Sequence, residues 1–191
     1  MPNLYIIAGC NGAGKTTASG TIFPEVLNCK EFVNADNIAA GISPYNVEGV
    51  AFEAGRIMLM RINELMDAGA DFAFETTLST LSYVSLVKKA RKLNYKVTLI
   101  FIWLSSPEIA MQRVKERVDN GGHNIPRDII VRRYFRGIKN LFNLFMPICD
   151  VWILADNSER MLTTIARKEE FENVIENHDL WVIINKQQYE S

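Results

Sequence analysis

The sequence has no long apolar run and almost no net charge, and each absence excludes a class of protein. No apolar stretch reaches the roughly 18 residues that a membrane-spanning helix needs. The N-terminus lacks a basic segment followed by a long apolar region, so we expect a cytoplasmic protein. The net charge is −1, from 21 Lys and Arg against 22 Asp and Glu, which provides no overall field to attract nucleic acid or an anionic membrane.

Cysteine is scarce as well. The three cysteines, Cys10, Cys29 and Cys149, form no C-x-x-C pair, so neither a disulfide framework nor a zinc site is indicated. A chain of 191 residues with 48% hydrophobic composition can bury one sizeable core. We therefore expect a single domain over residues 1–191 with reduced, mostly buried thiols.

Against these absences stands one strong motif. Residues 9–17 read G-C-N-G-A-G-K-T-T, which fits G-x-x-x-x-G-K-[ST], and they follow an apolar run of strand length at residues 4–8. Such a loop binds phosphates through its backbone N–H groups, with the lysine on the β- and γ-phosphates and the threonine hydroxyl on Mg²⁺. The residues expected to hold a nucleoside triphosphate are Gly9, Asn11, Gly12, Ala13, Gly14, Lys15, Thr16 and Thr17, with Thr16 as the magnesium ligand.

The remaining periodicity predicts alternating strands and helices. Strands are expected at 31–34, 73–74, 97–104 and 151–155, and helices at about 47–66, 78–93, after Pro107 and after Pro126. A hairpin near 163–175 and a helix opened by Asp179 follow. This order predicts an α/β P-loop fold in three layers, an open, mostly parallel sheet of about five strands with helices on both faces. The carboxyl ends of its strands should form the binding edge.

Several signatures of other nucleotide-binding proteins are missing. The guanine-specific N-K-x-D is absent, since residues 185–188 read N-K-Q-Q, and there is no signature of an ABC-type motor. The strongest strand ends in Leu104-Ser105-Ser106, with no carboxylate to hold a Walker-B magnesium. Asp156 ends another apolar strand and is interpreted as a loop or cap residue. The absence of the guanine signature therefore favours ATP over GTP.

The chain does contain the parts of a kinase. Asp36 and Glu75 are expected at the ends of two early strands, where one carboxylate could accept the proton of a hydroxyl acceptor and the other could hold the acceptor or a hydrated Mg²⁺. The alternatives are a helix cap for Asp36 and a partnered strand-end carboxylate for Glu75. An arginine-rich helix–Gly-Gly–helix unit follows, either a lid over the nucleotide at about 108–140 or a solvated basic face.

Four segments together resemble the zeta toxin family, and in particular its compact chromosomal branch. They are the phosphate loop, residues 32–36 (F-V-N-A-D), residues 74–79 (F-E-T-T-L-S) and residues 117–126 (R-V-D-N-G-G-H-N-I-P) followed by R-R-Y at 132–134. The likeness spans about residues 4–158, which leaves a C-terminal appendage at about 158–191.

The resemblance implies a P-loop kinase that uses ATP and Mg²⁺ to phosphorylate a hydroxyl of UDP-N-acetylglucosamine and that an antitoxin holds inactive. It implies Asp36 as the base and Glu75 at the acceptor site. Catalytic roles are then expected for Lys15, Asp36, Arg117 and Arg133, a nucleotide contact for Arg113, and acceptor contacts for Asp36, Glu75, Thr76, Thr77, Arg132 and Arg136.

Two other functions remain open at this point. The basic lid could hold a short nucleic acid, which would make the chain a polynucleotide 5′-hydroxyl kinase. The chain could also be a nucleotide-binding module of a toxin–antitoxin pair with no acceptor of its own.

Overall fold

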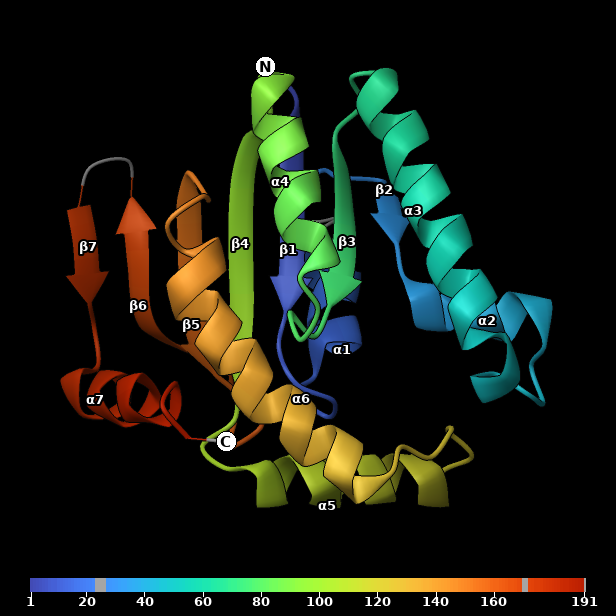
Figure 1. The fold of residues 1–191 in the computed structure, drawn as a ribbon. Coiled ribbons are helices and arrows are strands. Elements are labelled where there is room, and N and C mark those ends of the chain that lie inside the picture. The colour runs from blue at the N-terminus through green and yellow to red at the C-terminus, as the bar shows by residue number, and fades with distance from the viewer. Residues whose placement is uncertain (23–26, 170–171, 191) are drawn as a thin grey trace.

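The computed structural model describes residues 1–22, 27–169 and 172–190 of the chain. Its centre is a seven-stranded sheet in the order β2-β3-β1-β4-β5-β6-β7 (Figure 1). The first five strands in this order are parallel, and the last two add an antiparallel hairpin. This confirms the predicted α/β fold and the hairpin near 163–175. The strands are β1 (Asn3–Ala8), β2 (Glu31–Val33), β3 (Phe72–Thr76), β4 (Lys96–Trp103), β5 (Val151–Asp156), β6 (Thr163–Glu169) and β7 (Glu172–Ile175).

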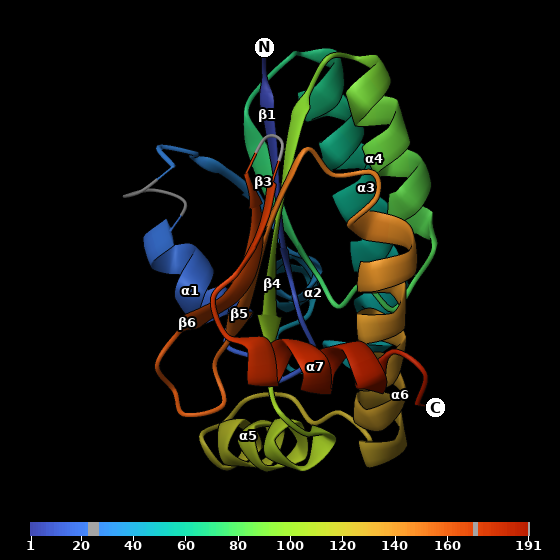
Figure 2. The same ribbon diagram turned by 90° about the vertical axis from the view of Figure 1, so that its left-hand side faces the viewer.

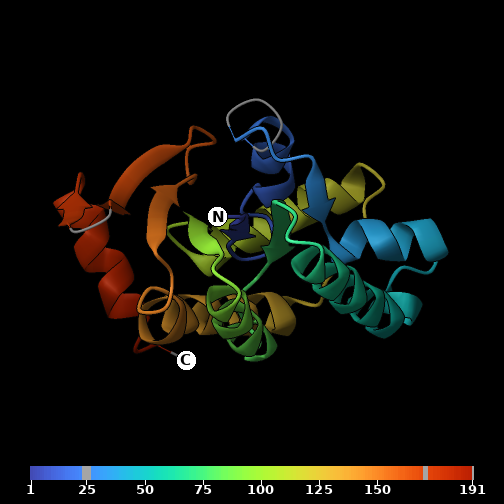
Figure 3. The ribbon, with the colours of Figure 1, turned by 90° about the horizontal axis from the view of Figure 1, so that it is seen from above.

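Helices cover both faces of the sheet (Figure 2). Helix α1 lies on one face, whereas α3, α4 and α6 line the other, and the view from above shows the same three layers (Figure 3). Helix α5 lies across the edge where the parallel strands end. The helices are α1 (Lys15–Thr21), α2 (Ala35–Ile42), α3 (Ala51–Asp67), α4 (Ser82–Lys92), α5 (Pro107–Asp119), α6 (Arg127–Asn140) and α7 (His178–Gln187), with short turns at Glu48–Val50 and Leu141–Phe145. Among the described residues, no helix is both long and apolar enough to cross a membrane.

The core forms around β4, the strand with the longest apolar run. It pairs with β1 on one side and β5 on the other, so both of its edges and both of its faces are covered. A strand covered in this way needs apolar side chains on both faces, which is why its sequence does not alternate. From Leu99 to Leu104 every side chain is at most 6% exposed.

Helix starts follow local capping chemistry in two places and depart from the prediction in a third. Ser106 caps α5 with Pro107 in its first turn, as expected. Asn34 caps α2. The prediction that a helix begins near Leu78 is wrong, because Leu78 has a positive φ of 55° and α4 starts only at Ser82. The intervening residues form a loop instead.

The C-terminal helix is tied to the rest of the fold by a buried group of polar side chains. The Gln187 carbonyl oxygen accepts from Trp103 Nε1 at 2.9 Å and lies 3.0 Å from the Tyr134 hydroxyl, and its amide donates to the Ser105 carbonyl at 3.0 Å. The Tyr134 hydroxyl donates to the Leu104 carbonyl at 2.6 Å. We call Trp103, Tyr134 and Gln187 the amide cluster. It joins α7 to α6 and to the end of β4, where the chain turns into α5.

Candidate functional site

The phosphate loop between β1 and α1 requires its glycines for conformation and for space. Gly9, Gly12 and Gly14 all have positive φ, between 79° and 144°. A Cβ on Gly9 would lie 2.2 Å from the Ile102 carbonyl oxygen, and one on Gly12 would lie 2.9 Å from the Ala110 carbonyl oxygen. Larger residues are therefore excluded because the loop packs directly on the backbone of β4 and α5.

Lys15 is folded over this loop and is only 7% exposed. Its Nζ donates to the Cys10 carbonyl oxygen at 2.9 Å and lies 3.6 Å from Glu75 Oε1. A buried ammonium needs such partners, because removing a charge from water is costly unless it is paired. The ammonium is thus held at the centre of the loop, within reach of a group bound there.

Glu75, near the end of β3, gathers several donors around one carboxylate. Its Oε2 accepts from Thr16 Oγ1 at 2.9 Å and from Asn34 Nδ2 at 2.8 Å, while Lys15 lies on its other oxygen. Lys15, Thr16, Asn34 and Glu75 are called the carboxylate cluster below. The alternative of a partnered strand-end carboxylate describes this geometry. Two of the three partners are the phosphate-loop residues that the motif assigns to phosphate and Mg²⁺.

Asp36 lies in the first turn of α2 with its side chain exposed. The capping alternative is wrong for this residue, because Asn34 supplies the cap: its Oδ1 accepts from the backbone N–H of Asp36 at 2.7 Å and of Asn37 at 3.2 Å. The Asp36 carboxylate is therefore not engaged in capping. It lines the two cavities described below that adjoin the loop.

Arg133 reaches from α6 to the phosphate loop. Its Nη1 donates to Asn11 Oδ1 at 3.2 Å. Burial lowers the pKa of the guanidinium, the negative charge of Asp36 opposes that change, and Arg132 adds to it. Since an arginine stays protonated under these conditions, α6 places a positive charge between the loop and Asp36.

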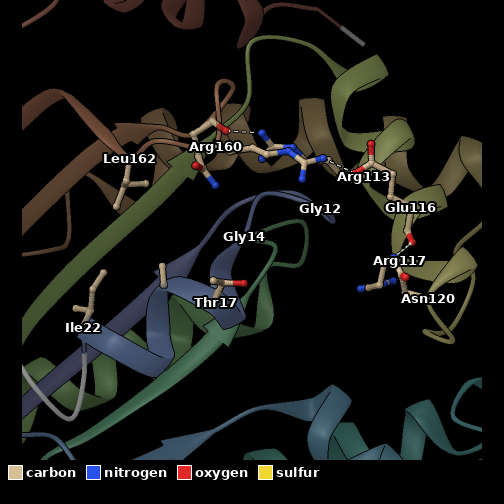
Figure 4. Close-up of a pocket in the computed structure, with 12 residues that line it drawn as sticks. Gly12, Gly14, Thr17, Ile22, Arg113, Glu116, Arg117, Asn120, Arg160 and Leu162 are labelled. Atoms are coloured by element: carbon tan, nitrogen blue, oxygen red, sulfur yellow. Dashed lines mark hydrogen bonds and ion pairs between the residues drawn. The ribbon is translucent and has the colours of Figure 1, made fainter.

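A cavity of about 660 Å³ opens beside the loop, between α1, α5 and the segment after β5. Figure 4 shows Gly12, Gly14 and Thr17 on one side of it and Arg113, Glu116 and Arg117 of α5 opposite. The Arg113 guanidinium donates to the carbonyl oxygens of Asn157 and Ser158, at 2.7 and 2.8 Å. We call it the donor cavity, because the phosphate loop forms its floor.

Two further arginines line the donor cavity. Arg117 donates through Nη2 to the His123 carbonyl oxygen at 3.1 Å, whereas its Nε is buried without a hydrogen-bond partner among the described residues. Arg160, in the segment after β5, pairs with Glu116 of α5 (Figure 4). This ion pair links the C-terminal appendage to the arginine-bearing helix at the border of the cavity.

A second cavity of about 570 Å³ lies on the Asp36 side of the loop. Its wall carries many hydroxyl groups, and Phe52 and Arg56 of α3 also line it, Phe52 being 84% exposed. We call it the acceptor cavity. The predicted site residues that line it are Asn11, Lys15, Asp36, Glu75, Thr76, Thr77 and Arg133.

A smaller side cavity of about 280 Å³ shares Asn11, Asp36 and Arg133 with the acceptor cavity and adds Arg132 and His123. Asp36 and Arg133 thus stand at the junction of the two. Arg136 is exposed and lines none of these three cavities. The predicted contact between Arg136 and the acceptor therefore stays a prediction.

Some residues of the site were not identified from the sequence. Asn157 follows β5, donates to the Ala13 carbonyl oxygen at 2.8 Å and lines the donor cavity with Arg160. Its place after a strand at the binding edge is a signal that could have found it. Phe52 and Arg56 lie four residues apart on α3, outside the apolar stripe. Nothing in the sequence marks them, since their role depends on where α3 packs.

Comparison with known proteins shows the family of this chain. A model of the zeta toxin family matches residues 1–144 of the chain. The chain belongs to the zeta toxin family. It is therefore a zeta toxin-like P-loop kinase, as the four sequence segments indicated. An uncharacterised protein of Haemophilus influenzae is 32% identical over 126 residues, which cover 66% of this chain and 88% of that protein.

Two solved structures show the same fold at low identity. The AvrRxo1-ORF1:-ORF2 complex with ATP matches with a TM-score of 0.79 and 18% identity, over 98% of this chain. The chain spans only 64% of the length of the AvrRxo1 chain it matches. A structure from the PezAT chromosomal toxin–antitoxin system of Streptococcus pneumoniae matches with a TM-score of 0.65 and 16% identity, over 98% of this chain and 86% of the other.

Proposed function

We propose that this chain transfers the terminal phosphoryl group of ATP to a hydroxyl group of a small polar molecule. One observation carries the proposal: the same loop lines two cavities, the donor cavity through Gly12 and Gly14 and the acceptor cavity through Asn11 and Lys15. A phosphoryl group at Lys15 would thus be reachable from both. The AvrRxo1 structure with ATP supports the choice of donor.

On the donor side, the loop backbone and the arginines would hold the triphosphate. The Lys15 ammonium, now on the Cys10 carbonyl, would move its hydrogen bonds to phosphate oxygens. The partnerless Nε of Arg117 would gain an acceptor. Arg113 is already engaged by the carbonyls after β5, so we assign it to shaping the cavity around the nucleotide.

On the acceptor side, Asp36 would take the proton from the acceptor hydroxyl. The hydroxyl oxygen would form the new bond to the γ-phosphorus as the bond to the ADP oxygen breaks, and ADP would leave with the bonding electrons. Lys15 and Arg133 would stabilise the negative charge on the transferring group electrostatically, through their fixed positive charges and without proton transfer. Glu75 would orient the acceptor from the end of β3.

The residues present also fit a magnesium ion. Thr16 offers a hard oxygen ligand, and its hydroxyl lies 2.9 Å from the Glu75 carboxylate, which could accept from a water of the hydrated ion. Mg²⁺ in kinases commonly takes one or two protein oxygens and fills its shell with water and phosphate. Bound there, the ion would neutralise part of the phosphate charge. The described residues hold no group of three or more His, Cys, Asp or Glu side chains that would suit a metal held by protein alone.

The acceptor cavity favours a ligand with both a ring and polar groups. Phe52 offers an exposed aromatic face, Arg56 a positive charge, and Thr76, Thr77 and Ser79 offer hydroxyls. UDP-N-acetylglucosamine, which the family resemblance implies, combines these features and is the first acceptor to test. A steep dependence of acceptor affinity on salt would point instead to a nucleic-acid 5′-hydroxyl.

Asp36→Ala tests the proposal. We expect phosphoryl transfer from labelled ATP to fall roughly 10²- to 10⁴-fold, because a positioned base contributes about that much. ATP affinity should stay within about threefold, since Asp36 lines the acceptor side only. Asp128→Asn is the matched control: it also removes an exposed first-turn carboxylate, from α6, and should leave transfer unchanged. Normal transfer in the Asp36 variant would refute Asp36 as the base.

We also propose an antitoxin-like protein partner, supported by the AvrRxo1-ORF1:-ORF2 complex and the PezAT system among the similar structures. The measurement is growth of a bacterial host that expresses the chain alone. Growth arrest by the wild type and normal growth with Asp36→Ala would support a toxic kinase activity. Equal growth with both chains at equal expression would contradict it.

A further inference from the structure

Asn34 makes three hydrogen bonds at the centre of the candidate site, although the zeta-toxin resemblance gives it no role. It lies between β2 and α2 and is only 5% exposed. Its amide oxygen accepts from the backbone N–H groups of Asp36 and Asn37. Its amide nitrogen donates to Glu75 at 2.8 Å. One buried amide therefore joins the backbone of the candidate base to the carboxylate of the acceptor site.

The identity of the two amide atoms follows from their neighbours. The oxygen faces two N–H donors, and the nitrogen faces a carboxylate. In the opposite orientation the amide N–H would face the two backbone N–H groups, and the amide oxygen would face the carboxylate oxygen. Asn is the smallest side chain that offers both a donor and an acceptor in one rigid plane. Serine or aspartate can cap a helix, but an aspartate cannot donate to Glu75.

The other partners of Glu75 have a second use, whereas Asn34 does not. Lys15 and Thr16 belong to the phosphate loop, and under the proposed function a triphosphate and its cation compete with Glu75 for them. Asn34 lies outside the phosphate loop, and the two backbone N–H groups on its oxygen hold the plane of its amide in place. When the loop is loaded, Asn34 is the donor that remains on Glu75.

We propose that Asn34 is a positioning residue that holds the Glu75 carboxylate in the acceptor site and fixes its place relative to Asp36. The inference rests on the proposed function, because it assumes that Glu75 orients the acceptor. It adds a device to that function: the acceptor carboxylate keeps its orientation while the phosphate loop exchanges its own hydrogen bonds for those of the donor.

Asn34→Asp separates this role from the capping role. The variant keeps an oxygen that caps α2, and it loses the N–H that donates to Glu75. We expect kcat/KM for the acceptor to fall roughly tenfold to a hundredfold, as for a misplaced substrate-orienting group. The KM for ATP should change little. The melting temperature should fall, because the new carboxylate faces the Glu75 carboxylate, and it should recover in an E75A background. Asn34→Ala loses the cap as well, so it should lower both the melting temperature and kcat/KM.

Asn177→Asp is the matched control. Asn177 caps α7 in the same manner, with its Oδ1 accepting from the Leu180 N–H at 3.1 Å. It lines none of the three cavities. The same chemical change at that cap should leave all kinetic constants unchanged. A comparable loss of kcat/KM in this control would show that the effect of Asn34→Asp is not specific to the site.

A double-mutant cycle tests whether Asn34 acts through Glu75. In an E75A background, N34D should change transfer by less than about twofold, because the group it positions is gone. A full additional loss in that background would overturn the inference. The acceptor probe is the small-molecule fraction of a bacterial extract with labelled ATP, titrated by dilution.

One readout requires no acceptor. In the wild type, the side-chain amide protons of Asn34 should show a downfield, slowly exchanging resonance from the hydrogen bond to a carboxylate, both without nucleotide and with ATP. E75A should remove it. Loss of the resonance on ATP binding would overturn the inference while leaving the proposed function intact. If D36A transfers normally but the resonance behaves as expected, the proposed function fails and the positioning of Glu75 stands.

Discussion

Two polar clusters lie at the binding edge, one open to solvent at Thr16 and the other buried throughout, and they are built on opposite principles. The carboxylate cluster is charged, with Lys15 and Thr16 on Glu75 in positions that a ligand's oxygens could also occupy. The amide cluster is neutral, and its members bond to one another and to backbone carbonyls. The first can exchange partners without leaving a buried group unpaired, and the second cannot.

This difference indicates that one cluster serves activity and the other serves stability. Buried ion pairs are weak contributors to stability, because desolvation offsets their attraction, whereas losing one partner leaves an uncompensated charge. Neutral hydrogen bonds that are complete in the interior specify packing. We therefore expect changes in the carboxylate cluster to affect activity most, and changes in the amide cluster to affect stability most.

Among the changes that compare the two clusters, Lys15→Met has the largest expected effect. Phosphoryl transfer should fall roughly 10²- to 10³-fold, because the variant lacks a charge that stabilises the transferring group. The free energy of unfolding should fall too, because Glu75 keeps its charge with one cation fewer. Urea denaturation of K15M in an E75Q background should show a smaller loss of stability and no recovery of activity. Equal losses in both backgrounds would contradict the paired-charge description.

Gln187→Leu is expected to have the opposite profile. It leaves Trp103 Nε1 and the Ser105 carbonyl without partners, so unfolding should become easier by about 2–3 kcal/mol. ATP affinity should stay within about threefold. The matched control is Gln188→Leu, since Gln188 is also buried but its amide bonds only to Asn185. A loss of transfer without a loss of stability in Gln187→Leu would break the comparison.

Gly137→Ala probes the contact between helix α6, which carries Tyr134 of the amide cluster, and the loop that lines the acceptor cavity. Gly137 lies on α6 three residues after Tyr134, and a Cβ there would come within 2.7 Å of the Thr77 carbonyl oxygen, just after β3. Overpacking of this kind costs about 1–3 kcal/mol, and we expect a weaker acceptor affinity because Thr77 lines that cavity. Gly41→Ala, in α2 with open space around it, should be neutral or stabilising. Thermal unfolding of both variants measures the contrast.

The effect that is smallest at neutral pH is that of the Cys10 thiol, which appears only in alkaline solution. Burial raises the pKa of the Cys10 thiol from 9.0 to about 11, although Lys15 and Arg113 lower it. The thiol is protonated in both states below pH 9, so its contribution to stability is present there. Between about pH 9 and 11 only the unfolded state ionises, and stability should fall by up to about 1.4 kcal/mol per pH unit. Cys10→Ala should reduce this slope in alkaline urea titrations, and an unchanged slope would exclude Cys10 as a source.

Much of the fold could be predicted because local signals and packing agree. The apolar run of β4 required a central strand, and the apolar stripe of α3 ended at Gly69, which has a positive φ of 63°. Trp103 and Trp152, in two apolar strands, belong to the core, since both are at most 4% exposed. The prediction that a helix begins near Leu78 was wrong because the hydroxyl-bearing residues that follow Leu78 resemble helix caps. They form a loop that lines the acceptor cavity.

The candidate site was predictable where chemistry sits in a contiguous motif. The glycines, Lys15 and Thr16 are specified by spacing alone, because phosphate binding needs those residues on one short loop. Asp36 and Glu75 could be proposed from their positions near strand ends. Asn34 and Arg56 could not be assigned functions, since the role of Asn34 depends on a neighbour 41 residues away and that of Arg56 on how a helix packs.

The sequence by itself determined the phosphate loop, the alternation of strands and helices, and the family to which the chain belongs, because these depend on short-range spacing and hydrophobic periodicity. Only the tertiary structure decided that Asn34 joins Asp36 to Glu75 and that the C-terminal helix secures the arginine-bearing helices. The physical reason is that a buried polar group must find its partner in space, and sequence distance carries no information about which partner that will be.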